Sequence, residues 1–162
     1  MKRKRFAGKG QEFWNKEYKT GNHLALSQNP SEDLAKFTRW LERAYGREYL
    51  NPLASVLDLG CGNGRNLIYL AKNFGMKGVG YDISHEATAQ AKRGSVDLKI
   101  EYQTRSIAQP LLVPDESQTL VLDMMTSHFL KHEERVNLLN EIVRVLRPGG
   151  WLFLKTFLRD ED

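Results

Sequence analysis

The spacing of hydrophobic positions changes at about residue 55 of the chain. Before this point, large apolar side chains recur every three or four residues, as on one face of an α-helix, at Leu34, Phe37, Trp40, Leu41 and Tyr45. Pro30 and the acidic residues after it predict the start of this helix with Ser31 as N-cap, and Gly46 predicts its end. We expect this apolar face to pack into the core.

From residue 55 onward, short apolar runs alternate with segments of helical spacing. The predicted strands cover residues 55–59, 77–82, 98–103, 119–124 and 151–157. The predicted helices cover residues 65–73, 84–93 and 133–146, and the last has an apolar stripe at Val136, Leu139, Ile142, Val143 and Leu146. Because strands and helices alternate, we expect right-handed crossovers and a parallel sheet with helices on both faces, which is a Rossmann-like, doubly wound α/β fold.

The first predicted strand runs directly into the glycine-rich stretch VLDLGCGNGRN, residues 56–66. Ligands of open parallel sheets bind at the carboxyl ends of the strands, where glycines let the backbone approach a ligand closely. Asp82 ends the next strand, at the spacing where an acid can bind ribose hydroxyls. A dinucleotide loop would have glycine or alanine in place of Arg65, and a P-loop would end in G-K-[ST]. Both of these ligand classes are therefore disfavoured.

The segment VLDLGCGNG, which begins at Val56, resembles the first motif of class I S-adenosylmethionine-dependent methyltransferases. Three more segments agree with that family in order and spacing: VGYDIS from Val79, PDESQTLVLDMMTSHFL from Pro114 and EIVRVLRPGGWLFL from Glu141. The stretch GCGNGRNLIYLA is also similar to the tellurite-resistance and thiopurine methyltransferase-like branch. The resemblance covers residues 55–157 and implies S-adenosyl-L-methionine as cofactor, with S-adenosyl-L-homocysteine as product.

The resemblance also implies which residues contact the cofactor. Asp58 would orient the loop and reach the methionine amino group, and Asp82 would accept the ribose hydroxyls. The backbone would pass close to the cofactor at Gly60, Cys61, Gly62 and Gly64. The other expected contacts are Ile83, Ser106, Ile107, Asp123 and Met124. At Ser106 the chain departs from the family, which often has an acid there for the adenine amino group.

Some of these positions also have a purely structural interpretation. Cys61 can be only a small residue in a tight loop, Asp82 can cap the following helix, and Asp123 can pair with a local backbone group. For the chemistry, methyl transfer from a sulfonium mainly requires alignment of the reacting atoms, and a general base is needed only where the acceptor must lose a proton. The predicted catalytic residues are Asp123 and His128, and His132 is either a third candidate or a solvated histidine.

The aromatic segment near the N-terminus has two interpretations. It either folds over the cofactor as a lid or packs on the sheet, and it contains Phe13, Trp14, Tyr18 and His23.

Charge and composition narrow the function classes. The net charge of +4 comes from the N-terminus, at Lys2, Arg3, Lys4, Arg5 and Lys9. We therefore divide the chain into a basic tail, residues 1–10, and a single methyltransferase-like domain, residues 11–162. The tail is either a solubilising terminus or an arm that meets phosphate, for example in RNA.

The single Cys61 excludes a disulfide within the chain, and no metal is expected. With no apolar run long enough for a membrane span and no secretory signal, we expect a cytoplasmic protein without a membrane partner.

Missing motifs argue against several methyl acceptors. DNA amino methyltransferases carry [DNS]-P-P-[YFW] where this chain has Asp123-Met124-Met125-Thr126, and cytosine-C5 enzymes need a cysteine after proline. We expect transfer to a small molecule. The alternatives are an RNA methyltransferase guided by the tail and a cofactor-binding module without turnover.

The family's sheet normally continues with a sixth and a seventh strand, whereas this sequence ends at Asp162. A truncated chain, a compact variant and a dimer are the three explanations. We expect the fifth strand to be an exposed edge, and a homodimer to form through residues 151–157.

Overall fold

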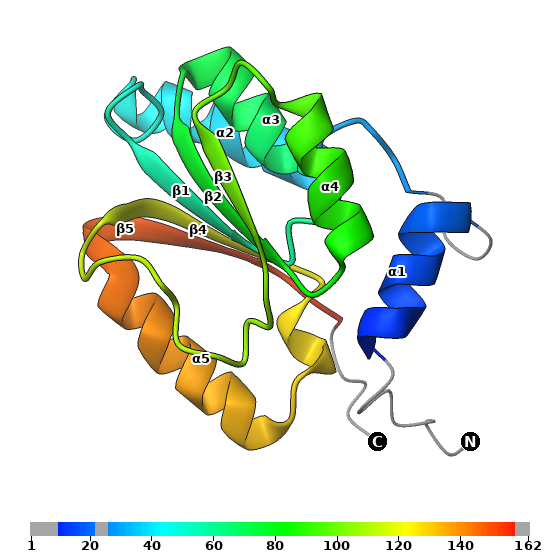
Figure 1. Cartoon of the computed structure of the whole chain (residues 1–162). Coiled ribbons are helices and arrows are strands. Elements are labelled where there is room, and N and C mark those ends of the chain that lie inside the picture. The colour runs from blue at the N-terminus through cyan, green and yellow to red at the C-terminus, as the bar shows by residue number, and fades with distance from the viewer. Residues whose placement is uncertain (1–9, 22–25, 158–162) are drawn as a thin grey trace.

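The computed structural model describes residues 10–21 and 26–157, and its strands form one sheet (Figure 1). The strands are β1 (Ser55–Leu59), β2 (Lys77–Asp82), β3 (Ile100–Thr104), β4 (Gln118–Met124) and β5 (Leu146–Lys155). Their order is β3-β2-β1-β4-β5, and every neighbouring pair is parallel. The order reverses direction between β1 and β4, which places a ligand crevice at the carboxyl ends of these strands.

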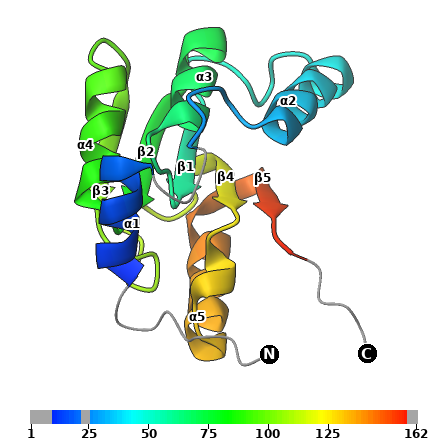
Figure 2. The same cartoon turned by 90° about the vertical axis from the view of Figure 1, so that its right-hand side faces the viewer.

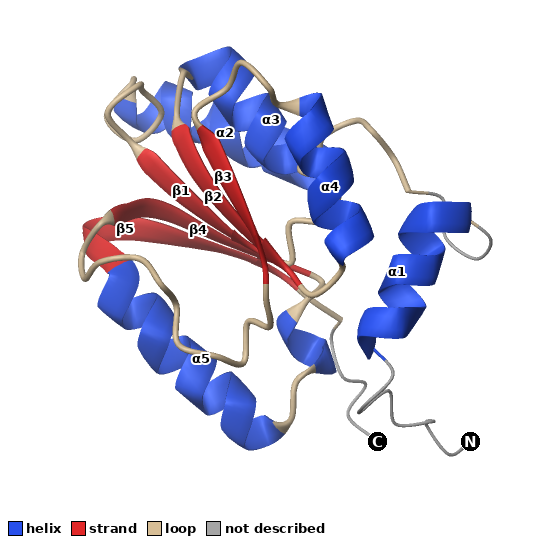
Figure 3. Ribbon diagram, viewed as in Figure 1, coloured by secondary structure: helices blue, strands red, loops and turns tan. Residues whose placement is uncertain are grey.

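The helices cover both faces of the sheet, which confirms the predicted doubly wound fold (Figures 2 and 3). They are α1 (Gly10–Thr20), α2 (Glu32–Tyr45), α3 (Arg65–Phe74), α4 (His85–Gly94), α5 (His132–Val145) and the 3₁₀ turn η1 (Ser127–Phe129). Helices α2, α3 and α4 lie over one face and α5 lies over the other, whereas α1 lies beyond the carboxyl ends of the strands, beside α4 (Figure 1). None of the described helices is long and apolar enough to cross a membrane.

The side chains of a central strand point alternately to the two faces of the sheet, so the core has two layers. In β1, Val56 packs with the layer that α2 and α3 cover, whereas Leu57 and Leu59 pack with the layer under α5. All three side chains are buried, as expected for a central parallel strand that is covered on both faces.

The helix predicted after Pro30 is confirmed as α2, with Ser31 as N-cap and Gly46 as C-cap, but the capping bond and part of the apolar face differ from the prediction. Ser31 stands at the N-cap without a side-chain capping bond, and its backbone N–H donates to Asn66 Oδ1 at 3.0 Å. Trp40 and Tyr45 are 41% and 42% exposed, because they lie at the border of the sheet, where their rings contact that of Trp151.

The apolar stripe predicted for the last helix is only partly right. Ile142 is buried, but Val136, Leu139 and Val143 are exposed. The buried face of α5 consists of Leu138, Ile142 and Val145. The segment therefore carries two apolar stripes. Tertiary packing on the sheet decides which of the two is buried.

The fifth strand begins earlier than predicted and ends at Lys155 instead of at residue 157. The segment Pro148-Gly149-Gly150 lies between the predicted helix and the predicted strand, but it belongs to β5. The register jumps there, since Gln118 pairs with Leu146 and Leu120 pairs with Trp151. This irregularity absorbs the extra residues of β5.

Strand β5 forms the border of the sheet in the part of the chain that the structure describes, because its only described partner is β4. Exposed apolar side chains lie on and around it, at Tyr45, Val143, Leu154 and Phe157. A strand edge with free N–H and C=O groups beside apolar side chains is a template for association.

Self-association through β5 therefore stays a prediction, and light scattering over a range of protein concentrations measures it. We expect the chain to associate, and we expect Leu154→Lys to weaken association by about tenfold or more because it places a charge at the border strand. Val96→Lys, at an exposed apolar position in the turn before β3, the strand at the opposite edge of the sheet, is the control and leaves association unchanged. A wild-type chain that stays monomeric at all concentrations contradicts the prediction.

Candidate active site

The glycines of the loop between β1 and α3 have no space for side chains. Gly60 and Gly62 have φ angles of 82° and 55°, in the left-handed region that other residues rarely adopt. A Cβ atom at Gly60 would collide with the side chain of Thr126, and one at Gly62 would collide with the hydroxyl of Tyr18. The loop is thus a surface of bare backbone on which other groups lie directly.

Four backbone N–H groups fix this loop and the start of α4 to the end of β2. The N–H groups of Gly60 and Cys61 donate to the carbonyl of Tyr81 at 2.7 and 2.9 Å. Gly62 N–H donates to Asp82 Oδ2 at 2.9 Å, and Ser84 N–H donates to Asp82 Oδ1 at 2.8 Å. Burial raises the pKa of Asp82, while the two N–H donors oppose that shift. Asp82 therefore joins the loop to the start of α4, and the N-cap hydroxyl of α4 comes from Ser84.

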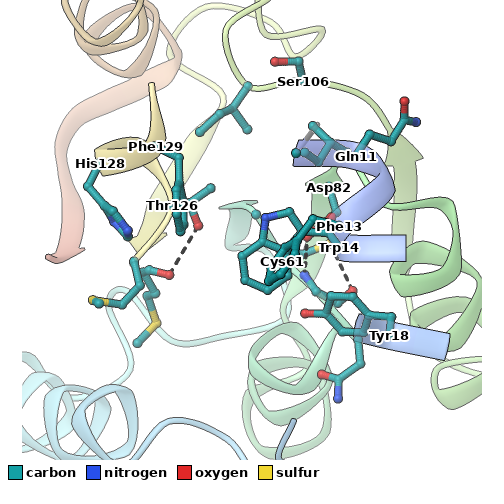
Figure 4. A pocket seen from close by; sticks show the side chains of 18 of the residues that line it. Gln11, Phe13, Trp14, Tyr18, Cys61, Asp82, Ser106, Thr126, His128 and Phe129 are labelled. Carbon is teal, nitrogen blue, oxygen red and sulfur yellow. Dashed lines mark hydrogen bonds between the residues drawn. The ribbon is translucent and has the colours of Figure 1, made fainter. Parts of the chain in front are cut away.

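A cavity of about 830 Å³ opens above this loop, at the carboxyl ends of the strands (Figure 4). The predicted site residues that line it are Gly60, Cys61, Gly62, Asp82, Ile83, Ser106, Ile107, Met124 and His128. Three others, Asp58, Gly64 and Asp123, do not line it. A Cβ atom at Gly64 would meet Tyr102 and Ala91, so this glycine serves the packing of α3 and α4.

Asp58 lies directly behind the glycine loop and is 1% exposed. Its Oδ2 atom has no hydrogen-bond partner among the described residues. Burial, followed by the nearby carboxylates Asp82 and Asp123, raises the pKa of Asp58 to about 7. An unpartnered buried carboxylate is costly, so burial favours the protonated form of Asp58, and only a cationic partner would favour the ionised form.

The predicted catalytic residues differ in their surroundings. Asp123 is buried, and its Oδ1 accepts a hydrogen bond from the N–H of Ser127 at 3.1 Å, in agreement with the structural interpretation. His128 lines the cavity, and burial lowers its pKa against the opposing effect of Asp123. His132 begins α5 in an exposed position and does not line the cavity.

Helix α1 covers the cavity from the side opposite β4, as the lid interpretation expects (Figure 4). It is tied to α4, because Asn15 Oδ1 accepts from the hydroxyl of Ser84 at 2.8 Å and Gln90 Nε2 donates to the carbonyl of Tyr18 at 2.6 Å. The rings of Trp14 and Phe129 are 5.9 Å apart and join the lid to η1. His23, the other residue of the predicted lid, lies outside the described residues.

Several residues of the cavity wall were not predicted from the sequence, because the resemblance assigns them no role, although four of them lie in the segment 114–130. They are Gln11, Leu26, Met125, Thr126, Phe129, Leu130 and Phe157. Met125 has a positive φ of 63°, which only the structure reveals. Such backbone strain is frequent at functional sites.

The comparisons with known proteins agree with this geometry. A family model described as "Methyltransferase domain" matches residues 56–150, which is more than half of the chain. The chain belongs to this family, the class I S-adenosylmethionine-dependent methyltransferases. Membership in the thiopurine methyltransferase-like branch is not confirmed.

Two curated relatives show how far the similarity extends. The 27-O-demethylrifamycin SV methyltransferase of Amycolatopsis mediterranei is 32% identical over 75% of this chain and 45% of its own length. A tRNA (carboxymethyluridine(34)-5-O)-methyltransferase of Macaca fascicularis is 34% identical over 71% of this chain and 17% of its own length. The chain therefore spans less than half the length of either relative.

Among solved structures, a methyltransferase from Thiobacillus denitrificans in complex with S-adenosylhomocysteine is similar to this chain. The TM-score is 0.61 at 25% identity, over 84% of this chain and 52% of that one.

The raised pKa of Asp58 predicts a pH-dependent stability. The folded state holds this proton up to about pH 7, whereas an unfolded aspartate loses it near pH 4, so the contribution is fully present below pH 4 and is lost as the pH rises through 7. We expect Asp58→Asn to gain about 3–4 kcal/mol relative to the wild type between pH 4 and pH 8, measured by urea unfolding. Asp97→Asn, at an exposed position, is the control. Parallel pH curves for wild type and Asp58→Asn would contradict the prediction.

Proposed function

We propose that the chain binds S-adenosyl-L-methionine in this cavity and transfers its methyl group to a small-molecule acceptor. The observation that carries the proposal is the bare backbone of Gly60 and Gly62 between two carboxylates, the buried Asp58 behind the loop and the partly buried Asp82 beside it. Family membership and the relative that is named as a small-molecule methyltransferase support it.

The polar and apolar groups around the cavity fit the chemistry of this cofactor. Asp82 lies on the cavity wall at the end of β2, where it can accept the ribose hydroxyls while it holds the Gly62 N–H. Ile83 and Ile107 offer apolar surface for adenine near Ser106. The unpartnered Oδ2 of Asp58 matches the cationic amino group of the methionine part, and binding of that cation favours the ionised carboxylate.

The remaining residues orient the acceptor and exclude water. The bound cofactor supplies a methyl group on a sulfonium, and the protein has to hold the acceptor in line with it. Met124 and Thr126, where β4 opens into the cavity, and Trp14 on the lid shape this region. Because its pKa is lowered, His128 is neutral at pH 7 and can take a proton from an acceptor group.

Calorimetry with S-adenosylhomocysteine tests the cofactor site. We expect the wild type to bind, and Asp82→Ala to weaken binding by about tenfold or more, since two charge-assisted hydrogen bonds to the ribose are lost. Asp82→Asn keeps an acceptor oxygen for the Gly62 N–H, so it separates ligand binding from support of the loop. Asp97→Ala is the matched surface control. No binding by the wild type, or equal binding by Asp82→Ala, would reject the proposal.

RNA is the second candidate acceptor, because one relative is named as a tRNA methyltransferase and the basic residues gather at the N-terminus. That segment, residues 1–9, lies outside the described residues, and α1 begins at Gly10 within the predicted tail.

Deletion of residues 1–9 tests the RNA alternative. If the tail contacts RNA phosphates, the deletion lowers RNA affinity in filter binding and reduces the slope of log K against log salt by about 0.7 for each lost contact to a single strand. An unchanged affinity and an unchanged salt slope would exclude the arm.

A further inference from the structure

One side of the cavity is formed by a continuous row of rings. Trp14 of α1 contacts Phe129 of η1 at 5.9 Å between ring centroids, Phe129 contacts His128 at 4.0 Å, and His128 contacts Phe157 at 5.4 Å. Together with Met125 and Leu130, these side chains make up what we call the aromatic half of the cavity. In Figure 4, Phe129 and His128 lie across the cavity from Asp82.

Charged groups are confined to the other half. Among the described residues, the charged side chains on the cavity wall are Arg65 and Asp82, both beside the glycine loop. Arg65 Nη1 donates to the carbonyl of Asn29 at 3.1 Å, and it begins α3 on the far side of the loop from η1. The aromatic half thus contains no described lysine or arginine that could pair with an anion, and an unpaired anion in an apolar site is costly.

A cationic acceptor is also disfavoured, on the basis of the proposed function. The sulfonium of the cofactor carries a positive charge beside the acceptor, so a cation there meets like charge. A protonated amine, moreover, has no lone pair with which to attack the methyl carbon. An acceptor that binds against the row of rings is therefore uncharged.

We propose that the aromatic half binds an uncharged, ring-containing apolar molecule and directs its hydroxyl group to His128. This deepens the proposed function by naming an acceptor class, apolar hydroxyl compounds. His128 is the described titratable side chain on this half of the wall, and its ring packs against that of Phe129.

The reaction balances with the groups present. The acceptor oxygen forms a bond to the methyl carbon while the carbon–sulfur bond breaks, and the electron pair of that bond stays on sulfur. The hydroxyl proton passes to the imidazole of His128, which releases it to water. The products are a methyl ether and a neutral thioether.

Binding of three naphthalene compounds tests the acceptor class. The protein is saturated with sinefungin, a cofactor analogue whose ammonium group takes the place of the sulfonium, and titrated with 2-naphthol, 2-naphthyl phosphate and 2-naphthylmethylamine, which share one ring system and differ in charge at pH 7. We expect 2-naphthol to bind at least about tenfold more tightly than either charged compound. Equal or tighter binding of a charged compound, or no binding of 2-naphthol, overturns the inference. If S-adenosylhomocysteine fails to bind, the proposed function is rejected. If it binds but 2-naphthol is not preferred, only the acceptor class is rejected.

Two variants connect the result to the rings. Phe129 is 52% exposed, so Phe129→Ala is expected to fold, and it should weaken 2-naphthol binding more than it weakens S-adenosylhomocysteine binding. Leu53→Ala, which removes an exposed apolar side chain far along the chain from this wall, should leave both unchanged. Equal losses of both ligands in Phe129→Ala would contradict a role in acceptor binding.

The pH dependence of methyl transfer to 2-naphthol tests the role of His128. We expect His128→Ala to lower the rate at pH 7 by about tenfold or more, and to recover it as the pH approaches the phenol pKa of about 10, because an ionised oxygen needs no base. Transfer at the wild-type rate by His128→Ala at pH 7 would exclude this role.

Discussion

The hydrogen bonds between the glycine loop and the end of β2 are the constraint on which the site depends. They hold Gly60, Cys61 and Gly62 against Tyr81 and Asp82, so the loop turns sharply out of the sheet and leads into α3. Parallel pairing of β1 with β2 brings the two strand ends to the same edge of the sheet. The carboxylate of Asp82 therefore supports the loop and also forms part of the cavity wall. In the proposed function, ligand binding and local folding use the same atoms.

Much of the fold was predictable because its signals are local. Strands β1 and β2 have the predicted bounds, because the glycine-rich loop follows β1 directly and Asp82 ends β2. Helix α5 and strand β5 were harder, because α5 has two apolar stripes and Pro148-Gly149-Gly150 is a turn signal inside a strand. Which stripe is buried, and whether a strand passes through such a segment, depends on tertiary packing and pairing with β4.

The two halves of the cavity were not equally predictable. The half that contains the glycine loop follows from motifs, because Gly60 and Gly62 come directly after β1 and Asp82 ends β2. The aromatic half is assembled from α1, η1 and the residues after β5, which are distant in sequence. Trp14 and Phe129 meet only in three dimensions, so no spacing reveals their contact. One fold carries many different functions, so the surface for the acceptor is expected to follow less directly from family motifs.

A crystal structure of the chain with S-adenosylhomocysteine tests the central claim most directly. The account predicts ribose hydroxyls within hydrogen-bond distance of Asp82 and the amino group on the side of the loop where Asp58 lies, with the Gly62 N–H still bonded to Asp82. The aromatic half should stay free of the cofactor. A ligand bound elsewhere, or one that leaves Asp82 without a contact, would contradict it.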